Sequence, residues 1–352
     1  MNDLPDSLKD GLSTVLGQPA LTITANDGSR ATVLLHGGHL VSWIPAGADE
    51  QLYLSPRAVA GPGQAVRGGV PVIFPQFEQL GPDTSLPRHG LARTRVWQVE
   101  SHHARRDHTQ LTLVLSDDAE TRSLWPHGFR LELTISVGGP RLDLELYAEN
   151  TGETPWDFAA ALHTYLAVSD LTQVRLEGLQ GCRYKDRLLG GMTLEDHPEK
   201  RFHGEMDRIY HRAPDLLLRD GPRRLSLRSQ GFEDAVVWNP GPEKCAALKD
   251  MPPDGWQQML CVEPARIQSP VTLQPGESWA GLHTLALGLQ ALRNPLRQGL
   301  AFDGVGAHGD AIGVQRPKPR ALLGGAVQAR QKHQGQHAVV ATRGLGQLLQ
   351  GL

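Results

Sequence analysis

The chain has 352 residues, a formal net charge of −3, 39% hydrophobic residues and three cysteines. It is long enough to bury a full core, either as one large domain or as two. The slightly negative charge argues against a general nucleic-acid binder and against a protein that docks on an anionic membrane. The cysteines are odd in number and far apart, so the sequence predicts neither a disulfide framework nor a metal site; they are Cys182, Cys245 and Cys261.

The N-terminal residues predict no export signal. Four charged residues are spread through the first ten positions, where a signal peptide would be apolar. No apolar run in the chain approaches the roughly 18 residues that a membrane-spanning helix needs. We therefore expect a cytoplasmic protein without a membrane partner. Residues 1–19 are expected to form a separate N-terminal segment, with a helix over about 6–16.

Short runs rich in Leu, Val, Ile and Thr follow in chain order. Residues 142–148 alternate apolar and polar side chains, which is the period of a half-buried strand in an antiparallel sheet. Turn signals such as Asn26-Asp27-Gly28 separate these runs, and almost no helical periodicity lies between them. The pattern predicts an all-β fold, a large antiparallel β-sandwich or barrel. The expected strands are 20–25, 31–35, 111–115, 131–137, 142–148, 174–177, 224–228, 234–238, 259–263, 270–273 and 279–286.

The composition changes near residue 293. Residues 293–352 hold eight Lys or Arg against two acidic residues, with many Gly, Gln and Ala and a single aromatic residue. This tail lacks the apolar periodicity needed to bury a core, so we expect it to be disordered or loosely attached. A basic interaction tail is the alternative. The main domain is then expected over 20–292.

An unusual density of cations lies between residues 67 and 93. The segments RGGVPVIFPQF (67–77) and LPRHGLAR (86–93) place arginines and a histidine among glycines and prolines. Glycine lets a ligand approach the backbone, and a guanidinium group binds phosphate through two parallel hydrogen bonds. The segment therefore favours a small phosphorylated ligand, with Arg67, Arg88, His89 and Arg93 as candidate contacts.

Three other segments carry candidate chemistry. In residues 156–168, a strand would place His163 beside small alanines that leave room for a ligand, although a core histidine is at least as common. Glu263 ends an apolar strand, where its carboxylate needs a partner in a loop or in a pocket. Residues 204–210, which include Asp207, otherwise resemble an ordinary charged loop.

Taken together and in order, seven segments resemble the hexose-6-phosphate mutarotases (glucose-6-phosphate 1-epimerases) of the aldose 1-epimerase superfamily. The resemblance runs from about residue 20 to residue 290. It implies a β-sandwich of the galactose-mutarotase type, with the sugar lying across the concave face of one sheet. It also implies that no metal or other cofactor is needed. The segments are RGGVPVIFP, LPRHGLAR, WPHGFRL, ALHTYLAV, GEMDRIY, VVWNP and MLCVEPARI.

The resemblance also assigns roles to single residues. His163 and Glu263 match the catalytic acid and base of the family. The substrate-binding positions of the family are matched by Arg67, Arg93 and Asp207, and a histidine that lines the same cleft is matched by His89. The chain departs from the family at Arg88, where glutamine is frequent, and an added cation there would contact phosphate or point into solvent.

These residue types suit the interconversion of α and β anomers of a hexose 6-phosphate. Ring opening removes a proton from the C1 hydroxyl and delivers one to the ring oxygen, and reclosure reverses the two roles. The hypothesis takes ionised Glu263 as the base and the His163 imidazolium as the acid, on opposite sides of the anomeric centre. Two alternatives stay open: an aldose 1-epimerase for unphosphorylated sugars, and a non-catalytic module that binds sugar phosphates.

Overall fold

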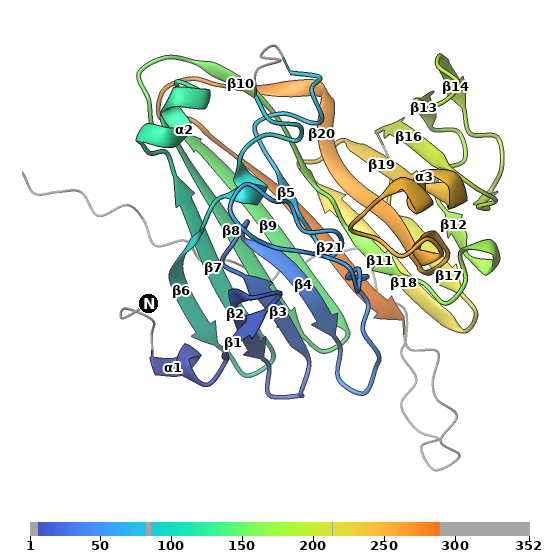
Figure 1. Cartoon of the computed structure of the whole chain (residues 1–352), viewed down its shortest axis with the longest axis horizontal. Coiled ribbons are helices and arrows are strands. Elements are labelled where there is room, and N and C mark those ends of the chain that lie inside the picture. Colours follow the sequence, from blue (N-terminus) through green and yellow to red (C-terminus); the bar gives the residue numbers. More distant parts are fainter. Residues whose placement is uncertain (1–5, 82–85, 213, 289–352) are drawn as a thin grey trace, which may run out of the picture. The chain divides into compact units, whose positions relative to one another are not determined.

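The computed structural model describes residues 6–81, 86–212 and 214–288 (Figure 1). The predicted tail over 293–352 lies outside these residues, as do the first five positions. Every strand pair in the described part is antiparallel, and three sheets account for all the named strands there. The prediction of an all-β antiparallel fold is confirmed.

The first sheet has four strands in chain order: β1 (Leu12–Val15), β2 (Gln18–Thr24), β3 (Arg30–Leu34) and β4 (His39–Ile44). The helix predicted over 6–16 is therefore wrong, because helix α1 covers only Asp6–Lys9. Leu16 and Gly17 both have positive φ, and Val15 pairs with Gln18. Such a two-residue turn closes a hairpin, which the apolar spacing alone did not reveal.

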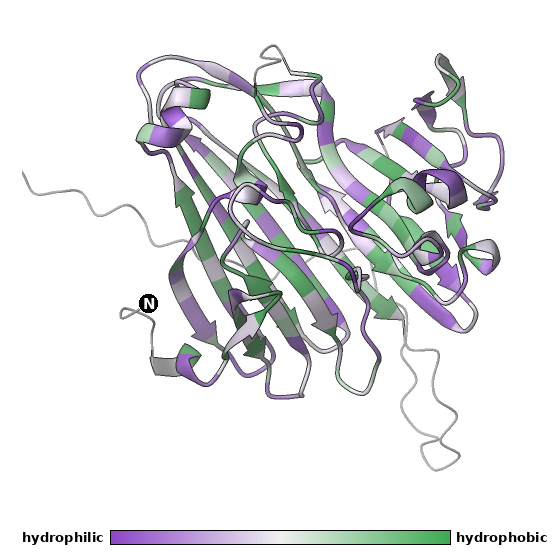
Figure 2. Cartoon of the chain, in the orientation of Figure 1, coloured by the Kyte–Doolittle hydropathy of each residue, from purple (hydrophilic) through white to green (hydrophobic). Residues whose placement is uncertain are grey.

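The second sheet has nine strands and supplies more residues to the main hydrophobic cluster than either of the other sheets. Apolar and polar side chains alternate along β8, and the apolar ones are buried, as the period of two predicts (Figure 2). In sheet order the strands are β15 (Glu199–Lys200), β12 (Arg175–Glu177), β17 (Leu216–Asp220), β18 (Arg223–Gln230), β21 (Ser278–Gly288), β9 (Arg141–Asn150), β8 (Phe129–Gly138), β7 (Thr109–Ser116) and β6 (Gln98–Ala104).

The third sheet has eight strands, and all the catalytic candidates lie on it or on loops beside it. In sheet order they are β14 (Met192–Leu194), β13 (Arg183–Asp186), β16 (Met206–His211), β19 (Asp234–Asn239), β20 (Met259–Leu273), β10 (Trp156–Leu162) and β5 (Val72–Ile73), while β11 (Tyr165–Ala167) also pairs with β20.

Helices are few and short in the described part of the chain. Besides α1 they are α2 (Ala119–Leu124) and α3 (Gly241–Ala247), with 3-10 turns at Ala92–Thr94, Leu171–Gln173 and Gly255–Gln258. None of the described helices is long and apolar enough to cross a membrane.

Strand β20 has both faces buried over residues 259–265, and the two faces differ in what they contact. Leu260 and Val262 join the main hydrophobic cluster, which holds residues of all three sheets. The alternate residues belong to two smaller clusters, Cys261 in one and Ala265 in the other. Glu263 lies between them, so its carboxyl group leaves the sheet on the face opposite the main core.

Candidate active site

The register of the eight-stranded sheet brings His163 and Glu263 together. Ala161 pairs with Ala265 on one side, and Tyr165 pairs with Cys261 on the other, so the same register sets His163 opposite Glu263. Side chains that are directly opposite in an antiparallel pair have Cβ atoms about 5 Å apart on the same face. Two residues a hundred positions apart in the chain are thereby made neighbours.

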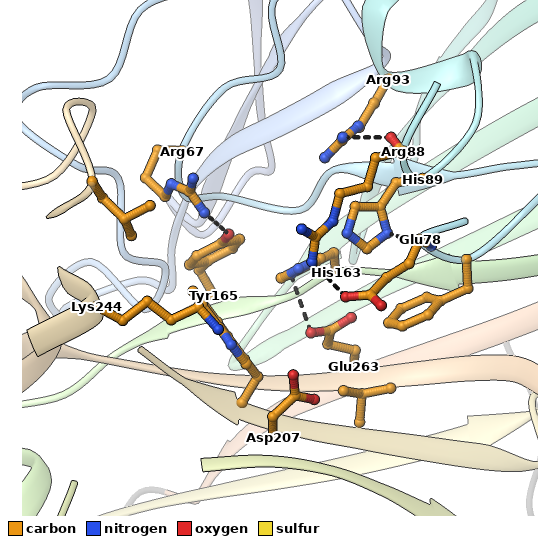
Figure 3. A pocket seen from close by; sticks show the side chains of 14 residues that line it. Arg67, Glu78, Arg88, His89, Arg93, His163, Tyr165, Asp207, Lys244 and Glu263 are labelled. Atoms are coloured by element: carbon orange, nitrogen blue, oxygen red, sulfur yellow. Dashed lines mark hydrogen bonds and ion pairs between the residues drawn. The ribbon is translucent and has the colours of Figure 1, made fainter. Parts of the chain in front are cut away.

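A cavity of about 210 Å³ opens above this pair (Figure 3). Val236 stands opposite Glu263 on the next strand, and both line the cavity. Asp207 lies one strand further on and pairs with Trp238, so it is displaced along the strand as well as across the sheet. All seven of the predicted site residues line this one cavity: Arg67, Arg88, His89, Arg93, His163, Asp207 and Glu263.

His163 and Glu263 are in direct contact. The Nδ1 atom of His163 lies 3.3 Å from Oε1 of Glu263, and the two residues are 9% and 1% exposed. His163 is stacked on Tyr165, with ring centroids 4.8 Å apart and planes within 9° of parallel. His163 Nδ1 and Glu263 Oε2 make no hydrogen bond in the described structure. The pair is therefore fixed in position by packing while these polar atoms stay available.

Burial shifts the pKa values of the two groups in opposite directions. Burial, with Arg93 and Arg67 nearby, holds the pKa of His163 well below its usual value. Burial, with Asp207 and Glu78 nearby, raises the pKa of Glu263 well above its usual value. Both shifts favour a neutral imidazole beside a protonated carboxyl group. The neutral form and the ion pair of the sequence-based hypothesis have the same number of protons. The transferable proton lies on Glu263 in the neutral form and on His163 in the ion pair.

Arg67 has a fixed carboxylate partner and faces the pair from a glycine-rich loop. Its Nε donates to Asp250 over 3.1 Å, and its Nη1 donates to the Tyr165 hydroxyl over 3.1 Å. Although burial opposes it, these two groups raise the pKa of Arg67. Gly68 has φ of 116°, and a Cβ there would lie 2.4 Å from the carbonyl oxygen of Tyr53. Only glycine lets the loop pack this closely.

Among the arginines that line the cavity, Arg93 is the one whose positive charge has no carboxylate partner within the described residues. Its Nη2 donates to the backbone carbonyl of Arg88 over 2.7 Å, and its buried Nε has no partner. No carboxylate within the described residues pairs with it. Burial, together with Arg67 and Arg88, lowers its pKa to about 10. Even a half-buried guanidinium group attracts an anion when it has no counter-charge.

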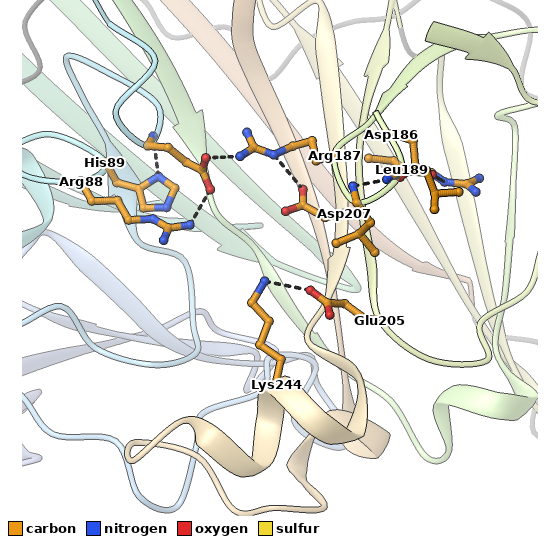
Figure 4. A network of polar contacts seen from close by, with 11 residues as sticks. Arg88, His89, Asp186, Arg187, Leu189, Glu205, Asp207 and Lys244 are labelled. Carbon is orange, nitrogen blue, oxygen red and sulfur yellow. Dashed lines mark hydrogen bonds and ion pairs between the residues drawn. The ribbon is translucent and has the colours of Figure 1, made fainter. Parts of the chain in front are cut away.

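A chain of ion pairs crosses the mouth of the cavity (Figure 4). Glu78 bonds Arg88 through one carboxylate oxygen and Arg187 through the other. Arg187 then reaches Asp207, with Nε 3.4 Å from Oδ1. Burial raises the pKa of Asp207 even though Arg187 opposes this shift. The side chain of Arg88 is 64% exposed, so this residue lies over the cavity rather than in it.

His89 is held as a neutral ring with a defined tautomer. Its ring Nδ1 accepts a hydrogen bond from the backbone N–H of Glu78 over 3.2 Å, and the backbone N–H of His89 donates to the Glu78 carbonyl over 2.8 Å. Burial, together with nearby His163 and the arginines, lowers the pKa of His89. The ring proton must then lie on Nε2. Both residues have positive φ, a strained conformation that is frequent at functional sites.

Comparison with known proteins identifies the family. Residues 19–285 match the aldose 1-epimerase family model. The chain belongs to the aldose 1-epimerase family. Proteins named "Putative glucose-6-phosphate 1-epimerase" match it from Cenchrus ciliaris (33% identity, 79% of this chain and 87% of that one) and from Escherichia coli (37% identity, 67% and 79%). A crystal structure of a "putative mutarotase" from Salmonella typhimurium superposes with a TM-score of 0.73 at 28% identity, over 78% of this chain and 92% of that one.

The aldose 1-epimerase family assignment confirms the resemblance inferred from the seven segments, and the fold agrees with it. Several lining residues were nevertheless missed by the sequence analysis. Lys244 comes from α3 and pairs with Glu205 over 2.9 Å. The mouth residues Glu78 and Arg187 are charged positions in ordinary loops, and no local motif marks them. Tyr165 and Trp238 also line the cavity, and in the sequence they are marked only as members of the segments ALHTYLAV and VVWNP.

Proposed function

We propose that this protein interconverts the α and β anomers of a hexose 6-phosphate, with glucose 6-phosphate as the first substrate to test. The observation that carries the proposal is the contact between His163 and Glu263 at the base of a cavity lined by three arginines. The names of the relatives from Cenchrus ciliaris and Escherichia coli support the same activity.

The geometry of the pair suits the chemistry of the anomeric carbon. The C1 hydroxyl and the ring oxygen are bonded to the same carbon, so the acid and the base must lie close to each other. Their contact at 3.3 Å therefore fits this role better than a placement on opposite sides of the sugar. One group takes the hydroxyl proton while the other protonates the ring oxygen, and the ring opens. After rotation about the C1–C2 bond, reclosure on the other face runs the transfers in reverse.

The pair needs a single proton in order to act. The neutral form, which burial favours, makes imidazole the base and the carboxyl group the acid. A phosphate dianion beside Arg67 and Arg93 would offset the two cations that disfavour imidazolium, and would move the proton toward His163. Because ring opening and reclosure use opposite roles, either starting form completes the cycle.

The remaining lining residues would bind different parts of the substrate. Arg93 lacks a carboxylate partner within the described residues, so we assign the phosphate to it, with Arg67 beside it. Asp207 lies two strands away from Glu263 in the sheet and lines the same cavity, where it would accept hydrogen bonds from sugar hydroxyl groups. His89 would donate from Nε2 toward the sugar.

Two-dimensional exchange NMR on glucose 6-phosphate tests the proposal directly. The α–β exchange rate should rise in proportion to enzyme concentration, and much less for glucose at the same concentration. Equal acceleration of glucose would favour an aldose 1-epimerase for unphosphorylated sugars. Saturable binding of glucose 6-phosphate without faster exchange would favour a non-catalytic binding module.

A further inference from the structure

Cys261 lies directly beside the His163–Glu263 pair. It precedes Glu263 by two positions on β20, so both side chains leave the same face of the strand. Sγ of Cys261, a ring nitrogen of His163 and a carboxylate oxygen of Glu263 all lie within 4.8 Å of one another. Cys261 is 0% exposed and does not line the cavity, so the mechanism above gives it no role.

The three side chains offer free electron pairs at one point. His163 Nδ1 and Glu263 Oε2 make no hydrogen bond, although both residues are at least nine-tenths buried. Buried polar atoms normally have a partner. A sugar hydroxyl would satisfy these two atoms during the reaction, but it would leave the sulfur untouched. A ligand that uses all three donors must be a small acceptor of electron pairs, which means a cation.

The donor set is that of zinc. Thiolate, imidazole and carboxylate are its usual protein ligands, and bond lengths of 2.0–2.3 Å set the ligand atoms of a tetrahedral site about 3.5 Å apart. The His163–Glu263 contact of 3.3 Å already meets this spacing. From the limit of 4.8 Å, the sulfur has to move by at most about 1.3 Å. Three protein ligands leave the fourth position of a tetrahedral site for a water molecule.

We propose that His163, Cys261 and Glu263 form an inhibitory site for Zn²⁺ or another thiophilic divalent cation. Charges of both signs act on the pair: Arg67 and Arg93 on His163, and Glu78, Asp207 and Arg187 on Glu263. Spacing of cysteines along the chain does not reveal the site, since its ligands come from two distant segments. Hard cations such as Mg²⁺ prefer oxygen donors and should not bind there.

Metal binding exchanges protons for coordinate bonds without any change of oxidation state. The thiol and the carboxyl group release their protons to solvent, and sulfur, nitrogen and oxygen each donate an electron pair to the cation. The coordinating nitrogen of His163 and the coordinating oxygen of Glu263 then hold the cation and can no longer exchange protons with the sugar. Binding does not depend on the reaction, whereas the inhibition rests on the proposed function.

Cobalt reports the binding without any assay of activity. Co²⁺ added to the chelator-treated wild-type protein should give a thiolate-to-cobalt charge-transfer band at one equivalent per chain. Glucose 6-phosphate should reduce the band, because sugar and metal use the same two side chains. A wild-type protein without this band would overturn the proposal, whether or not the enzyme anomerises sugars.

Two variants of Cys261 test whether its sulfur is a ligand of the cation. Cys261→Ser and, as a second form, Cys261→Ala should keep anomer exchange and lose the cobalt band. They should require at least about tenfold more Zn²⁺ for half-inhibition, since even an outer-sphere partner is worth about 10–100-fold in metal affinity. Cys245→Ala is the matched control, because Cys245 is also 0% exposed and belongs to the same small cluster as Cys261.

The outcomes separate the possibilities. Zinc sensitivity that is lost with Cys261 and kept without Cys245 supports the site. Equal zinc sensitivity of wild type and both Cys261 variants, or equal inhibition by Mg²⁺, would show that the cation acts on substrate phosphate or elsewhere and would overturn it. A normal cobalt band in a protein that does not anomerise any sugar would leave the metal site standing and refute the proposed function instead.

Discussion

The floor of the cavity and its rim are built in different ways. The floor, His163 and Glu263, is set by sheet register, is almost fully buried, and has atoms without hydrogen-bond partners. The rim, Arg67, Arg88 and Arg93, lies on loops and a 3-10 turn, and each arginine has a different partner: the Asp250 carboxylate, the Glu78 carboxylate and the backbone carbonyl of Arg88, respectively. Register fixes positions within the sheet, whereas loop ion pairs can change one residue at a time. Reaction type and substrate preference should therefore respond to separate substitutions.

The largest expected effect comes from the floor. Glu263→Gln and His163→Ala should each lower kcat by about 10²–10⁴-fold, the usual contribution of one positioned acid or base. KM for glucose 6-phosphate should change little, because the rim is intact. Glu263→Gln should also unfold at no lower urea concentration than wild type, because the carboxyl group that it removes is buried and has one oxygen without a hydrogen-bond partner. Wild-type exchange rates in either variant would refute the assignment.

The next effect tests what supports the rim. His39 is buried below the Arg67 loop, and its Nε2 donates to the Gly68 carbonyl over 2.7 Å. Burial lowers its pKa to about 4, below the value of 6.5 in the unfolded chain, so the unfolded state binds the proton first as pH falls. Its contribution to stability is complete above pH 6.5 and is lost as pH falls toward 4, by about 3 kcal/mol.

Urea unfolding at several pH values measures this loss. His39→Gln, which keeps a donor for Gly68, should lose less stability on acidification than wild type. His283→Gln is the matched control on the nine-stranded sheet, because burial likewise lowers the pKa of His283 to about 4. Both variants should flatten the pH dependence of stability, but only His39→Gln should raise KM for the phosphorylated sugar. If the two variants changed KM equally, His39 would have no specific role in positioning the Arg67 loop.

The sequence predicted the residue types of the site better than their arrangement. The alternation along 142–148 and the apolar runs predicted strands, because burial on one face leaves a period of two in the sequence. The contact between His163 and Glu263 depends on which strands pair and in what register, and no local pattern records a pairing across a hundred residues. The ion pairs of Glu78 and Arg187 depend on loop conformations with positive φ at Glu78 and His89. The hairpin at Leu16 and Gly17 was missed for the same reason.

Within the rim, Arg93 should matter most. Arg93→Gln removes a half-buried guanidinium group that no carboxylate among the described residues compensates. Charged hydrogen bonds contribute about 1.5–3 kcal/mol, so KM for glucose 6-phosphate should rise by about 10- to 150-fold. The weak exchange of glucose should stay the same, because glucose has no phosphate. A parallel loss for both sugars would place Arg93 with the floor rather than with the phosphate.

The smallest effect is expected at Arg88, the position where the resemblance led us to expect glutamine. Its side chain is 64% exposed and is already paired with Glu78. An exposed ion pair contributes about 0–1 kcal/mol, so Arg88→Gln should change KM for glucose 6-phosphate by at most about fivefold. Glu78→Gln is a more stringent second variant, because it removes the carboxylate that binds both Arg88 and Arg187. If Arg88→Gln instead matched Arg93→Gln in steady-state kinetics, the exposed arginine would have to leave Glu78 and close over the phosphate once substrate is bound.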